Sequence, residues 1–403
     1  MPDTRLTSLR CPPLNMHGFG AVSAYGWGTK ALIEGLAGGH HAATYGSHLG
    51  PGTVPFWMAP VPAPGEDNGE QTRYAEAVRY VADEAIESAL ESGWRPGPAV
   101  CVILTSARGD LEASSDLHLS ESELSLRRRY VRALPSTLLS SVAQQYGFNG
   151  PSMFLSAACA GGVTALHVGR SLLMTGAATD VVVIGADIGV DHPSVHSLAA
   201  LGPLQLDEPP DRVCRPFDAS SKGFSIGEGA GALVMSPRPS QARTQLLATA
   251  AANDHYHATS LRPDASVAIA AASRAIQDAG LDRHDVSGYL AHGSGTPQCS
   301  RLESDVLREL PNLRRVSALK PLLGHCRSAS PILEIAALSA SAVEHLPPPG
   351  GLPSTLDQPD GAESGVQHWL HAAFGFGGNI SFGVLRQTPA GDATPAAAET
   401  AAR

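Results

Sequence analysis

The stretch FLSAACAGGVTALHVGR, residues 154–170, places a cysteine between an apolar run and a segment rich in glycine and alanine. The apolar run predicts a strand and the residues after Cys159 predict a helix, so the cysteine lies at a strand-to-helix turn. Free N–H groups and the helix dipole at such a turn favour a thiolate, which makes the thiol nucleophilic near neutral pH. A free cysteine is also often simply buried, so a small packed hydrophobe is the alternative. The stretch alone leaves both interpretations open.

Outward from this stretch, apolar runs typical of strands alternate with helical patterns, which predicts an α/β fold. The strands are expected at residues 99–107, 152–158, 180–187, 229–236, 286–291 and 379–385. Besides the helix after the cysteine, helices are expected at residues 72–93, 265–281 and 330–346. Residues 49–71, rich in proline and glycine, are expected to be irregular.

The helices at 72–93 and 265–281 precede a strand in a similar way, which indicates an internal duplication of one α/β unit. We therefore expect an N-terminal half at residues 1–245 and a C-terminal half at 246–386. Residues 387–403 are rich in Ala, Pro and Thr, a composition typical of a disordered tail.

Composition excludes several classes of protein. The 403 residues are 43% hydrophobic and 16% charged, enough for a large core, and the net charge of -10 argues against nucleic acid as a partner. No run of 18 apolar residues and no signal-like start occur, so we expect no membrane association and no secretion. Six cysteines without a CxxC pair give no zinc pattern and suit a reducing cytoplasm. No nucleotide-binding motif is found either.

Two histidines strengthen the nucleophile interpretation. In LAHGSGTP, His292 follows an apolar run and precedes a glycine turn, and in VSALKPLLGHC, His325 follows a glycine. Strand ends beside flexible loops are where α/β folds place their chemistry, so one cysteine and two histidines there suggest acyl transfer. Lys320 lies in an apolar stretch and, if buried, needs a partner, for which Glu334 is the nearest candidate. An exposed lysine on a loop is the alternative.

These segments together resemble the β-ketoacyl synthase family of the thiolase fold. The resemblance spans nearly the whole chain and rests on GFGAVSAYGWGTKALIEGLAGG, SAACAGG, RPFDASSKGFSIGEGAGALV, DHYHATSLRPDASVAIAAASRAIQDAGL, AHGSGTP, ALKPLLGHC and FGFGG in this order. It implies a five-layer α-β-α-β-α fold built from two duplicated α/β halves. It also implies a dimer formed through the first half.

The resemblance further implies a mechanism. Cys159 would take an acyl group from a thioester, and its N–H and that of Phe376 would form the oxyanion hole. His292 and His325 would stabilise the enolate that forms when a malonyl-type thioester loses carbon dioxide. Phe376 in FGFGG matches the family's gating phenylalanine.

Other positions take supporting roles by the same resemblance. Lys320 and Glu334 would hold His325 and the local charges in place. Ser294 and Thr296 would hydrogen-bond the pantetheine arm of the carrier. The remaining positions expected to contact substrate are Leu198, His196, Gly377 and Asn379.

An acyl carrier protein is the expected partner, and it would bring the phosphopantetheine, so no bound cofactor is expected. A basic patch that could dock an acidic carrier consists of Arg127, Arg128, Arg129 and Arg132. A solvated charged turn or a cluster of ion pairs at the dimer edge is the alternative. The dimer is expected to be a homodimer or a heterodimer with another ketosynthase-like subunit.

The expected function is a β-ketoacyl-[acyl-carrier-protein] synthase of polyketide or specialised lipid biosynthesis. Asn379 stands where the family has threonine, Pro331 where it has glycine and Ser300 where it has an acidic residue. These departures concern substrate shape and the reaction, and leave two alternatives open. One is an acyltransferase that transfers the acyl group without decarboxylation, and the other is a non-catalytic partner subunit that sets chain length.

Overall fold

A computed structural model describes residues 11–64, 72–116, 123–340, 346 and 365–388 of the chain. The first half contains five strands of the main sheet, β1 (Leu14–Ser23), β5 (Val100–Thr105), β6 (Ser152–Leu155), β7 (Asp180–Asp187) and β9 (Gly229–Ser236). The second half contains five more, β10 (Thr244–Asn253), β11 (Gly288–Leu290), β12 (Arg315–Ser317), β13 (Gln367–Gly375) and β14 (Asn379–Gln387).

The two halves have the same topology, which confirms the predicted duplication. Along the sheet the order is β6-β5-β7-β9-β1 in the first half and β12-β11-β13-β14-β10 in the second. In each half the first three of these strands are parallel and the remaining pairings are antiparallel. A short antiparallel pairing of β1 with β10 joins the two halves into one continuous sheet.

The larger helices lie at equivalent places in the two halves. Counted along the chain, the first half has α2 (Arg73–Glu91) before its second strand of the sheet, β5. It has α5 (Pro135–Tyr146) before the third, β6, and α6 (Gly161–Met174) before the fourth, β7. The second half has α9 (Ser266–Asp278), α10 (Pro297–Arg308) and α12 (Ser330–Ala340) before the corresponding strands β11, β12 and β13.

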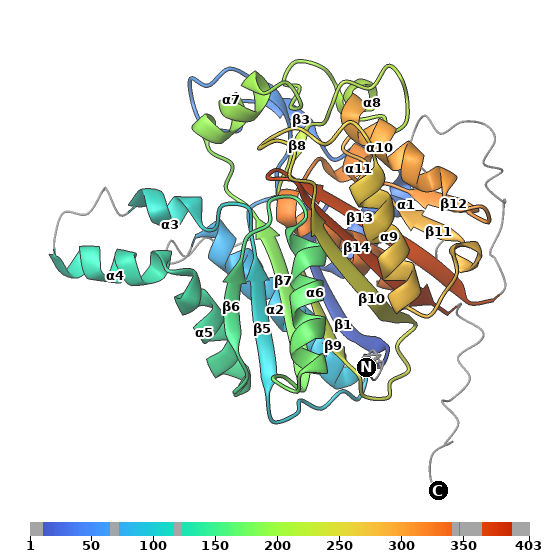
Figure 1. The fold of residues 1–403 in the computed structure, drawn as a ribbon. Coiled ribbons are helices and arrows are strands. Elements are labelled where there is room, and N and C mark those ends of the chain that lie inside the picture. Colours follow the sequence, from blue (N-terminus) through green and yellow to red (C-terminus); the bar gives the residue numbers. More distant parts are fainter. Residues whose placement is uncertain (1–10, 65–71, 117–122, 341–345, 347–364, 389–403) are drawn as a thin grey trace, which may run out of the picture.

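The helices and strands form five layers, as the predicted fold class requires (Figure 1). Three large apolar cores hold these layers together, and the middle core packs on both sides of the central helices. Helices α2 and α5 cover one outer face, α9 and α10 cover the other, and α6 and α12 lie between the two half-sheets. The middle helices carry small residues or are apolar nearly all round, because both of their sides face protein. The site can therefore form where the middle layer begins.

Shorter elements complete the fold. They are α1 (Thr29–Gly38), α3 (Leu111–Asp116), α4 (Glu123–Ala133), α7 (His192–Ala200), α8 (Pro210–Val213), α11 (Lys320–Leu323), the 3-10 turns η2 (Arg283–Asp285) and η3 (Arg327–Ala329), and the strands β2 (Gly26–Trp27), β3 (Thr44–Gly46), β4 (Phe56–Ala59) and β8 (Ile226–Gly227). No helix within the described ranges is long and apolar enough to cross a bilayer.

Most predicted elements match, with two differences. The segment at 49–71, expected to be irregular, contains β4, which the parallel pairing with β8 stabilises; its residues 65–71 lie outside the described part of the chain. Gln387, predicted to begin the tail, is the last residue of β14, where it pairs with Thr244. The rest of that tail, 389–403, also lies outside the described part. The proposed boundary at 245/246 falls just inside β10, and stays a prediction.

Close packing of α2 on β1 gives a test of the fold. At Gly20 of β1, a Cβ atom would lie 2.3 Å from the backbone oxygen of Val81 in α2. We expect Gly20→Ala to lower the free energy of unfolding by roughly 1–3 kcal/mol, because backbone must move to admit the methyl group. Gly383→Ala in β14 is the matched control, since its Cβ would meet nothing closer than 3.6 Å. Urea denaturation measures both, and equal stabilities of the two variants would contradict this account of the packing.

Candidate active site

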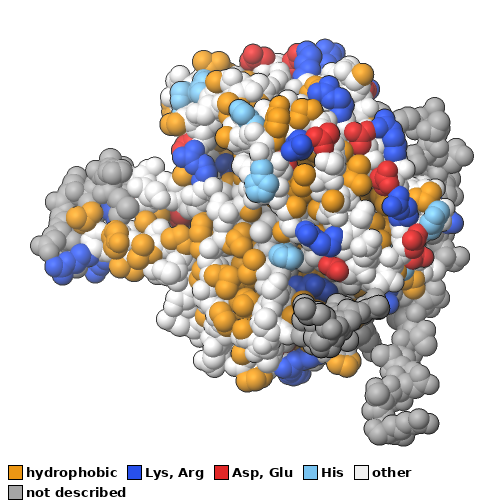
Figure 2. Space-filling view, in the orientation of Figure 1, with side chains coloured by type: hydrophobic (Ala, Val, Ile, Leu, Met, Phe, Trp, Pro, Cys, Tyr) orange, Lys and Arg blue, Asp and Glu red, His pale blue; other side chains and the backbone are white. Residues whose placement is uncertain are grey.

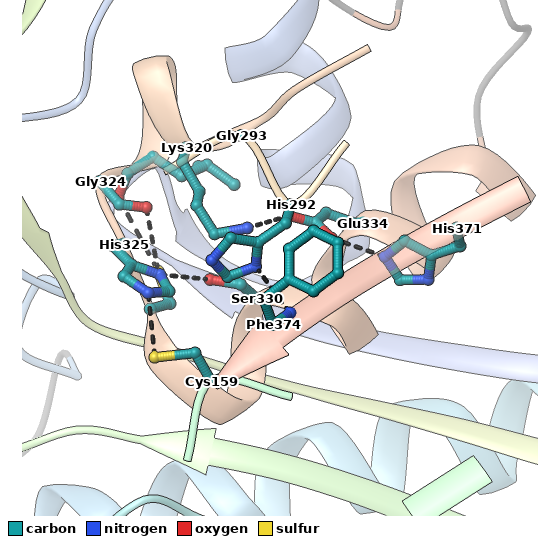
Figure 3. Close-up of polar contacts among 12 residues, drawn as sticks. Cys159, His292, Gly293, Lys320, Gly324, His325, Ser330, Glu334, His371 and Phe374 are labelled. Atoms are coloured by element: carbon teal, nitrogen blue, oxygen red, sulfur yellow. Dashed lines mark hydrogen bonds and ion pairs between the residues drawn. The ribbon is translucent and has the colours of Figure 1, made fainter. Parts of the chain in front are cut away.

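The predicted nucleophile lies at a strained turn between β6 and α6. Ala158, just before it, adopts φ 47°, a left-handed conformation that is costly for a residue with a side chain. The turn ends at Ala160, the N-cap of α6, so Cys159 is held at the start of the middle helix. Figure 3 shows its sulfur directed at the ring of His325.

Glycines allow α6 to begin at the centre of the protein. A Cβ on Gly161 would lie 2.5 Å from Oγ1 of Thr105 in β5, and one on Gly162 would lie 2.8 Å from Cβ of Pro331 in α12. The glycines of the opening motif are therefore required by close contacts with β5 and with the other middle helix. Pro331 is tolerated because it occupies the first turn of α12, where its missing N–H has no partner to lose.

His325 is in direct contact with the nucleophile. Its Nε2 lies 3.1 Å from Sγ of Cys159, and its Nδ1 lies 3.4 Å from the hydroxyl of Ser330. The preceding Gly324 adopts φ 71°, and a Cβ there would lie 3.0 Å from the backbone of Gly227. The glycine before the histidine is thus what lets this turn pass β8 and present the ring to the cysteine.

His292 follows β11 and faces the same space. The backbone N–H of Phe374 donates to its Nδ1 at 3.3 Å, which leaves the proton of the neutral ring on Nε2. Its ring centroid lies 5.6 Å from that of His325. Sequence reasoning missed Glu303 of α10, whose carboxylate accepts the backbone N–H of His292 at 2.8 Å and of Gly293 at 2.9 Å. Glu303 thereby fixes the turn that carries the histidine.

A buried network of charges lies behind the two histidines. Nζ of Lys320 donates to Oε1 of Glu334 at 2.8 Å, which confirms the predicted pair, and both side chains are only 2% exposed. The other oxygen of Glu334 accepts from Nε2 of His371 at 2.7 Å (Figure 3). His371 was not predicted, although a histidine between apolar residues in the strand before FGFGG is a signal that a buried partner exists.

The electrostatics correct one expectation about Cys159. Burial raises the pKa of its thiol to about 11, with a further increase from Asp187, and the nearby charges of Lys320 and Arg327 offset this only in part. The helix end alone therefore does not produce a thiolate at neutral pH. A base is needed, and His325 is the group within reach.

Both histidines are neutral at neutral pH. Burial, followed by the positive charge of Lys320, lowers the pKa of His292 and of His325 well below the usual value. Burial alone would also lower the pKa of Lys320, but Glu334 and Glu303 raise it above its ordinary value, so the lysine stays charged. The site therefore combines a thiol, two neutral imidazoles and a fixed ammonium group.

A cavity of about 680 Å³ contains the three groups. Cys159, His292 and His325 line it, together with Ser294 and Thr296, the two hydroxyl residues expected to hold pantetheine. The hydroxyl of Thr296 also accepts from the backbone of α10 as its N-cap. Helix α7 contributes Ser194, Ser197 and Leu198, and its C-cap contributes Leu201; the four share one face at helical spacing.

Of the remaining residues predicted to contact substrate or to form the gate, some line the cavity and others do not. Leu198 and Phe376 line the cavity. His196 does not, because it lies on the opposite face of α7, where it is exposed and packs against His192. Gly377 and Asn379 do not line it either: Asn379 instead donates to the carbonyl of Phe376 at 2.7 Å and so supports the gate turn. Direct contact of these three residues with substrate stays a prediction, which the lining of the cavity does not support.

The predicted basic patch lies on α4, which extends away from the body of the molecule (Figures 1 and 2). Arg127, Arg128 and Arg132 are exposed, whereas Arg129 is half-buried and donates to the backbone of Asp116. None of the four lines the cavity. Their role in docking a carrier stays a prediction.

Comparison with known proteins agrees with the geometry. Family models of the β-ketoacyl synthase N-terminal and C-terminal domains match residues 67–241 and 244–349. The ketoacyl synthase alpha subunit of the tetracenomycin polyketide synthase from Streptomyces glaucescens is 27% identical, over 91% of this chain and 95% of that protein. A putative polyketide β-ketoacyl synthase 1 from Streptomyces virginiae is 31% identical, over 76% of this chain and 79% of that protein.

Solved structures share the fold. A ketosynthase in complex with its chain length factor from Xenorhabdus doucetiae has a TM-score of 0.78 at 21% identity, covering 94% of this chain and 98% of that one. A type II polyketide ketosynthase in complex with its acyl-carrier protein has a TM-score of 0.77, also at 21% identity, covering 94% of this chain and 100% of that one.

The five-layer duplicated fold and the thiol with two imidazoles define a condensing enzyme of the acyltransferase class. The two family models, and the relative at 31% identity, specify the family. The chain belongs to the β-ketoacyl synthase family, which confirms the resemblance drawn from its motifs.

The buried network gives a prediction about stability. Glu334→Ala leaves the ammonium of Lys320 and the ring of His371 without their partner, so we expect a loss of roughly 3–5 kcal/mol in the free energy of unfolding. The control is Glu208→Ala, because Glu208 pairs with Lys222 at an exposed position, where an ion pair contributes at most about 1 kcal/mol. Chemical denaturation compares the two variants, and losses of equal size would contradict the assigned role of Glu334.

The lowered histidine pKa values predict how stability depends on pH. The unfolded chain binds protons at these histidines below about pH 6.5, whereas the folded protein does not, so stability falls as pH falls through that value. Each histidine contributes at most about 1.4 kcal/mol per pH unit in that window. Denaturation at pH 7.5, 6.5 and 5.5 measures this slope. A variant with both His292→Gln and His325→Gln should show a smaller slope, and an unchanged slope would refute the assignment.

Proposed function

We propose that the protein is a β-ketoacyl-[acyl-carrier-protein] synthase of polyketide biosynthesis, which joins a Cys-bound acyl group to a malonyl-type thioester with loss of carbon dioxide. One observation supports this most directly. The sulfur of Cys159 lies 3.1 Å from Nε2 of His325, with His292 beside them, in one cavity. The polyketide synthase relatives at 27% and 31% identity support the pathway class.

In the first step, the acyl group moves onto the enzyme. Sγ of Cys159 attacks the carbonyl carbon of an acyl thioester while its proton passes to Nε2 of His325. The new C–S bond forms as the bond to the pantetheine sulfur breaks. His325 then returns the proton to the departing sulfur, which leaves as a thiol. This requires a neutral His325, as burial ensures.

In the second step, a malonyl-type thioester enters and decarboxylates. The electron pair of the breaking C–C bond becomes an enolate, and Nε2–H of His292 donates to its oxygen. After acylation Cys159 has no proton to donate to His325, so that ring can carry its own proton on Nε2 and supply a second donor. The carbanion attacks the acyl carbonyl, a C–C bond forms, and the bond to Sγ breaks with its electron pair on sulfur. The thiolate then takes up one proton from solvent, which regenerates the thiol of Cys159.

Two backbone N–H groups are proposed to stabilise the oxyanion in both steps, those of Cys159 and Phe376. The approach of the gate turn supports this, since a Cβ on Gly375 would lie 3.1 Å from the backbone nitrogen of Cys159. Phe376 is 37% exposed and lines the cavity, as a gate between nucleophile and extender requires. Its turn is anchored by Asn253, which donates to the carbonyl of Gly377 at 2.6 Å.

Two partners are proposed. The first is an acyl carrier protein, whose phosphopantetheine would reach the site past Ser294 and Thr296; a solved ketosynthase of this fold was captured with its carrier. The second is another ketosynthase-like subunit, since a further neighbour was solved with its chain length factor. The edge strand β6 supports a dimer through the first half, because its outer edge is unpaired within the described chain and Phe154 on it is 38% exposed.

Separate assays of loading and condensation test the mechanism. Cys159→Ala should abolish acylation, as intact-protein mass spectrometry would show. His292→Ala should keep loading within about tenfold but lower condensation with malonyl-carrier by about 10²–10³-fold, because it removes an enolate donor and leaves the Cys–His pair intact. The exposed His284→Ala is the control and should change neither.

The same assays separate the alternatives. Acylated Cys159 without release of carbon dioxide from malonyl-carrier would favour an acyltransferase that does not decarboxylate its substrate. Unchanged pathway output with Cys159→Ala would favour a non-catalytic partner subunit.

A further inference from the structure

The cavity contains a buried cation that the proposed mechanism does not use. Arg327 lines it, and its side chain is only 8% exposed. Its Nε is buried and forms no hydrogen bond with the described residues. To bury an N–H donor of a guanidinium group without an acceptor is costly. Something that accepts hydrogen bonds is therefore expected in the cavity beside it.

Asp187, which pairs with Arg327 in the described part of the chain, does not meet this need. Oδ1 of Asp187 lies 3.7 Å from Nε, which is beyond hydrogen-bond distance. Asp187 instead accepts from the hydroxyl of Ser106 at 3.0 Å and from the backbone N–H groups of Ala107 at 3.1 Å and Ser328 at 2.7 Å. The carboxylate of Asp187 thus accepts its hydrogen bonds from other groups. It balances the charge of Arg327 without forming a hydrogen bond to its Nε.

The backbone holds Arg327 next to the nucleophile. Arg327 adopts φ 48°, an uncommon conformation for a residue with a long side chain. The neighbouring Ser328 fixes this turn, since its hydroxyl donates to the carbonyl of Ala158 at 2.7 Å. Ala158 immediately precedes Cys159, so the arginine and the sulfur belong to two turns that are directly hydrogen-bonded to each other.

Further polar side chains line the cavity. Arg108 lines it and donates to the hydroxyl of Ser194 on α7. Ser197 lies one turn further along the same face. An unsubstituted alkyl chain would have to desolvate these two arginines and hydroxyls without offering them any acceptor.

We propose that the acyl group carried by Cys159 bears a carboxylate, which Arg327 binds, so that the substrate is a half-thioester of a dicarboxylic acid and not a simple fatty acyl group. This rests on the proposed function, because it concerns the acyl group held by the same cysteine. A carboxylate supplies both the charge and the paired acceptors that a guanidinium fork prefers. The carboxylate of the extender is a second possible source. A tight ion pair there would oppose its loss as carbon dioxide, which favours the acyl group.

Loading rates with matched probes test this in the absence of any extender. The probes are pantetheine thioesters of succinate, glutarate and adipate, each compared with the monocarboxylic acyl group of equal carbon number, butanoyl, pentanoyl and hexanoyl. Intact-protein mass spectrometry follows acylation of the wild-type enzyme. At one or more chain lengths we expect the diacid thioester to acylate the enzyme at least about tenfold faster than its monocarboxylic partner. A ratio of this size corresponds to roughly one charge-assisted hydrogen bond.

Variants assign the preference to the arginine. Arg327→Leu should abolish or reverse it, and Arg327→Lys should retain part of it because the charge remains. Arg274→Leu removes the same charge from α9, away from the cavity, and should keep the wild-type ratio. If Arg327→Leu does not fold, the wild-type ratio and the Arg327→Lys variant decide.

Two results would overturn the inference: equal or faster loading of the monocarboxylic partner at all three lengths, or an unchanged preference in Arg327→Leu. Neither would affect the proposed function, since Cys159 would still be acylated. The absence of acylation by every probe and by acyl-carriers would instead count against the proposed function itself.

Discussion

The start of α12 occupies a space that exists only because glycines face it. A Cβ on Gly162 of α6, on Gly185 of β7 or on Gly231 of β9 would lie between 2.8 and 3.0 Å from side-chain atoms of the first residues of α12. The two middle helices can therefore begin side by side between the half-sheets. Since the nucleophile precedes one of these helices and His325 precedes the other, this close packing is what brings sulfur and imidazole into contact.

Charge is arranged so that the reacting groups stay neutral while the fixed charges lie behind them. Lys320 keeps its proton because Glu334 accepts from it, and its positive charge helps to keep both catalytic histidines unprotonated. A neutral imidazole can accept a proton from a thiol and can also donate to an enolate, whereas a permanently protonated ring could only donate. One buried ion pair thus serves both steps of the proposed reaction.

Much of the fold could be predicted because its signals are local. The apolar run at 229–236 is β9 to the residue, and the helix expected at 72–93 is α2 with its ends shortened by one or two residues. The segment around β4 was missed because its strand is stabilised by pairing with the short β3 on one side and with β8, about 170 residues away, on the other, and neither pairing is visible in the local pattern. That His196 lies outside the cavity could not be predicted for a related reason, since only the packing of α7 decides which face of that helix meets the cavity.

The sequence by itself determined the duplicated α/β architecture, the family, and the cysteine, two histidines, lysine and glutamate of the site, because motif order and hydrophobic period are local properties of a chain. Tertiary structure alone decided how they act. Burial raises the pKa of the thiol despite its place at the helix end, so the proposed reaction needs a base, and the fold brings His325 into contact with the sulfur. His371 and Glu303 join the site through contacts across 37 and 11 residues of sequence. Arg327 is a cation in the substrate cavity only because a left-handed turn, fixed by Ser328, places it there.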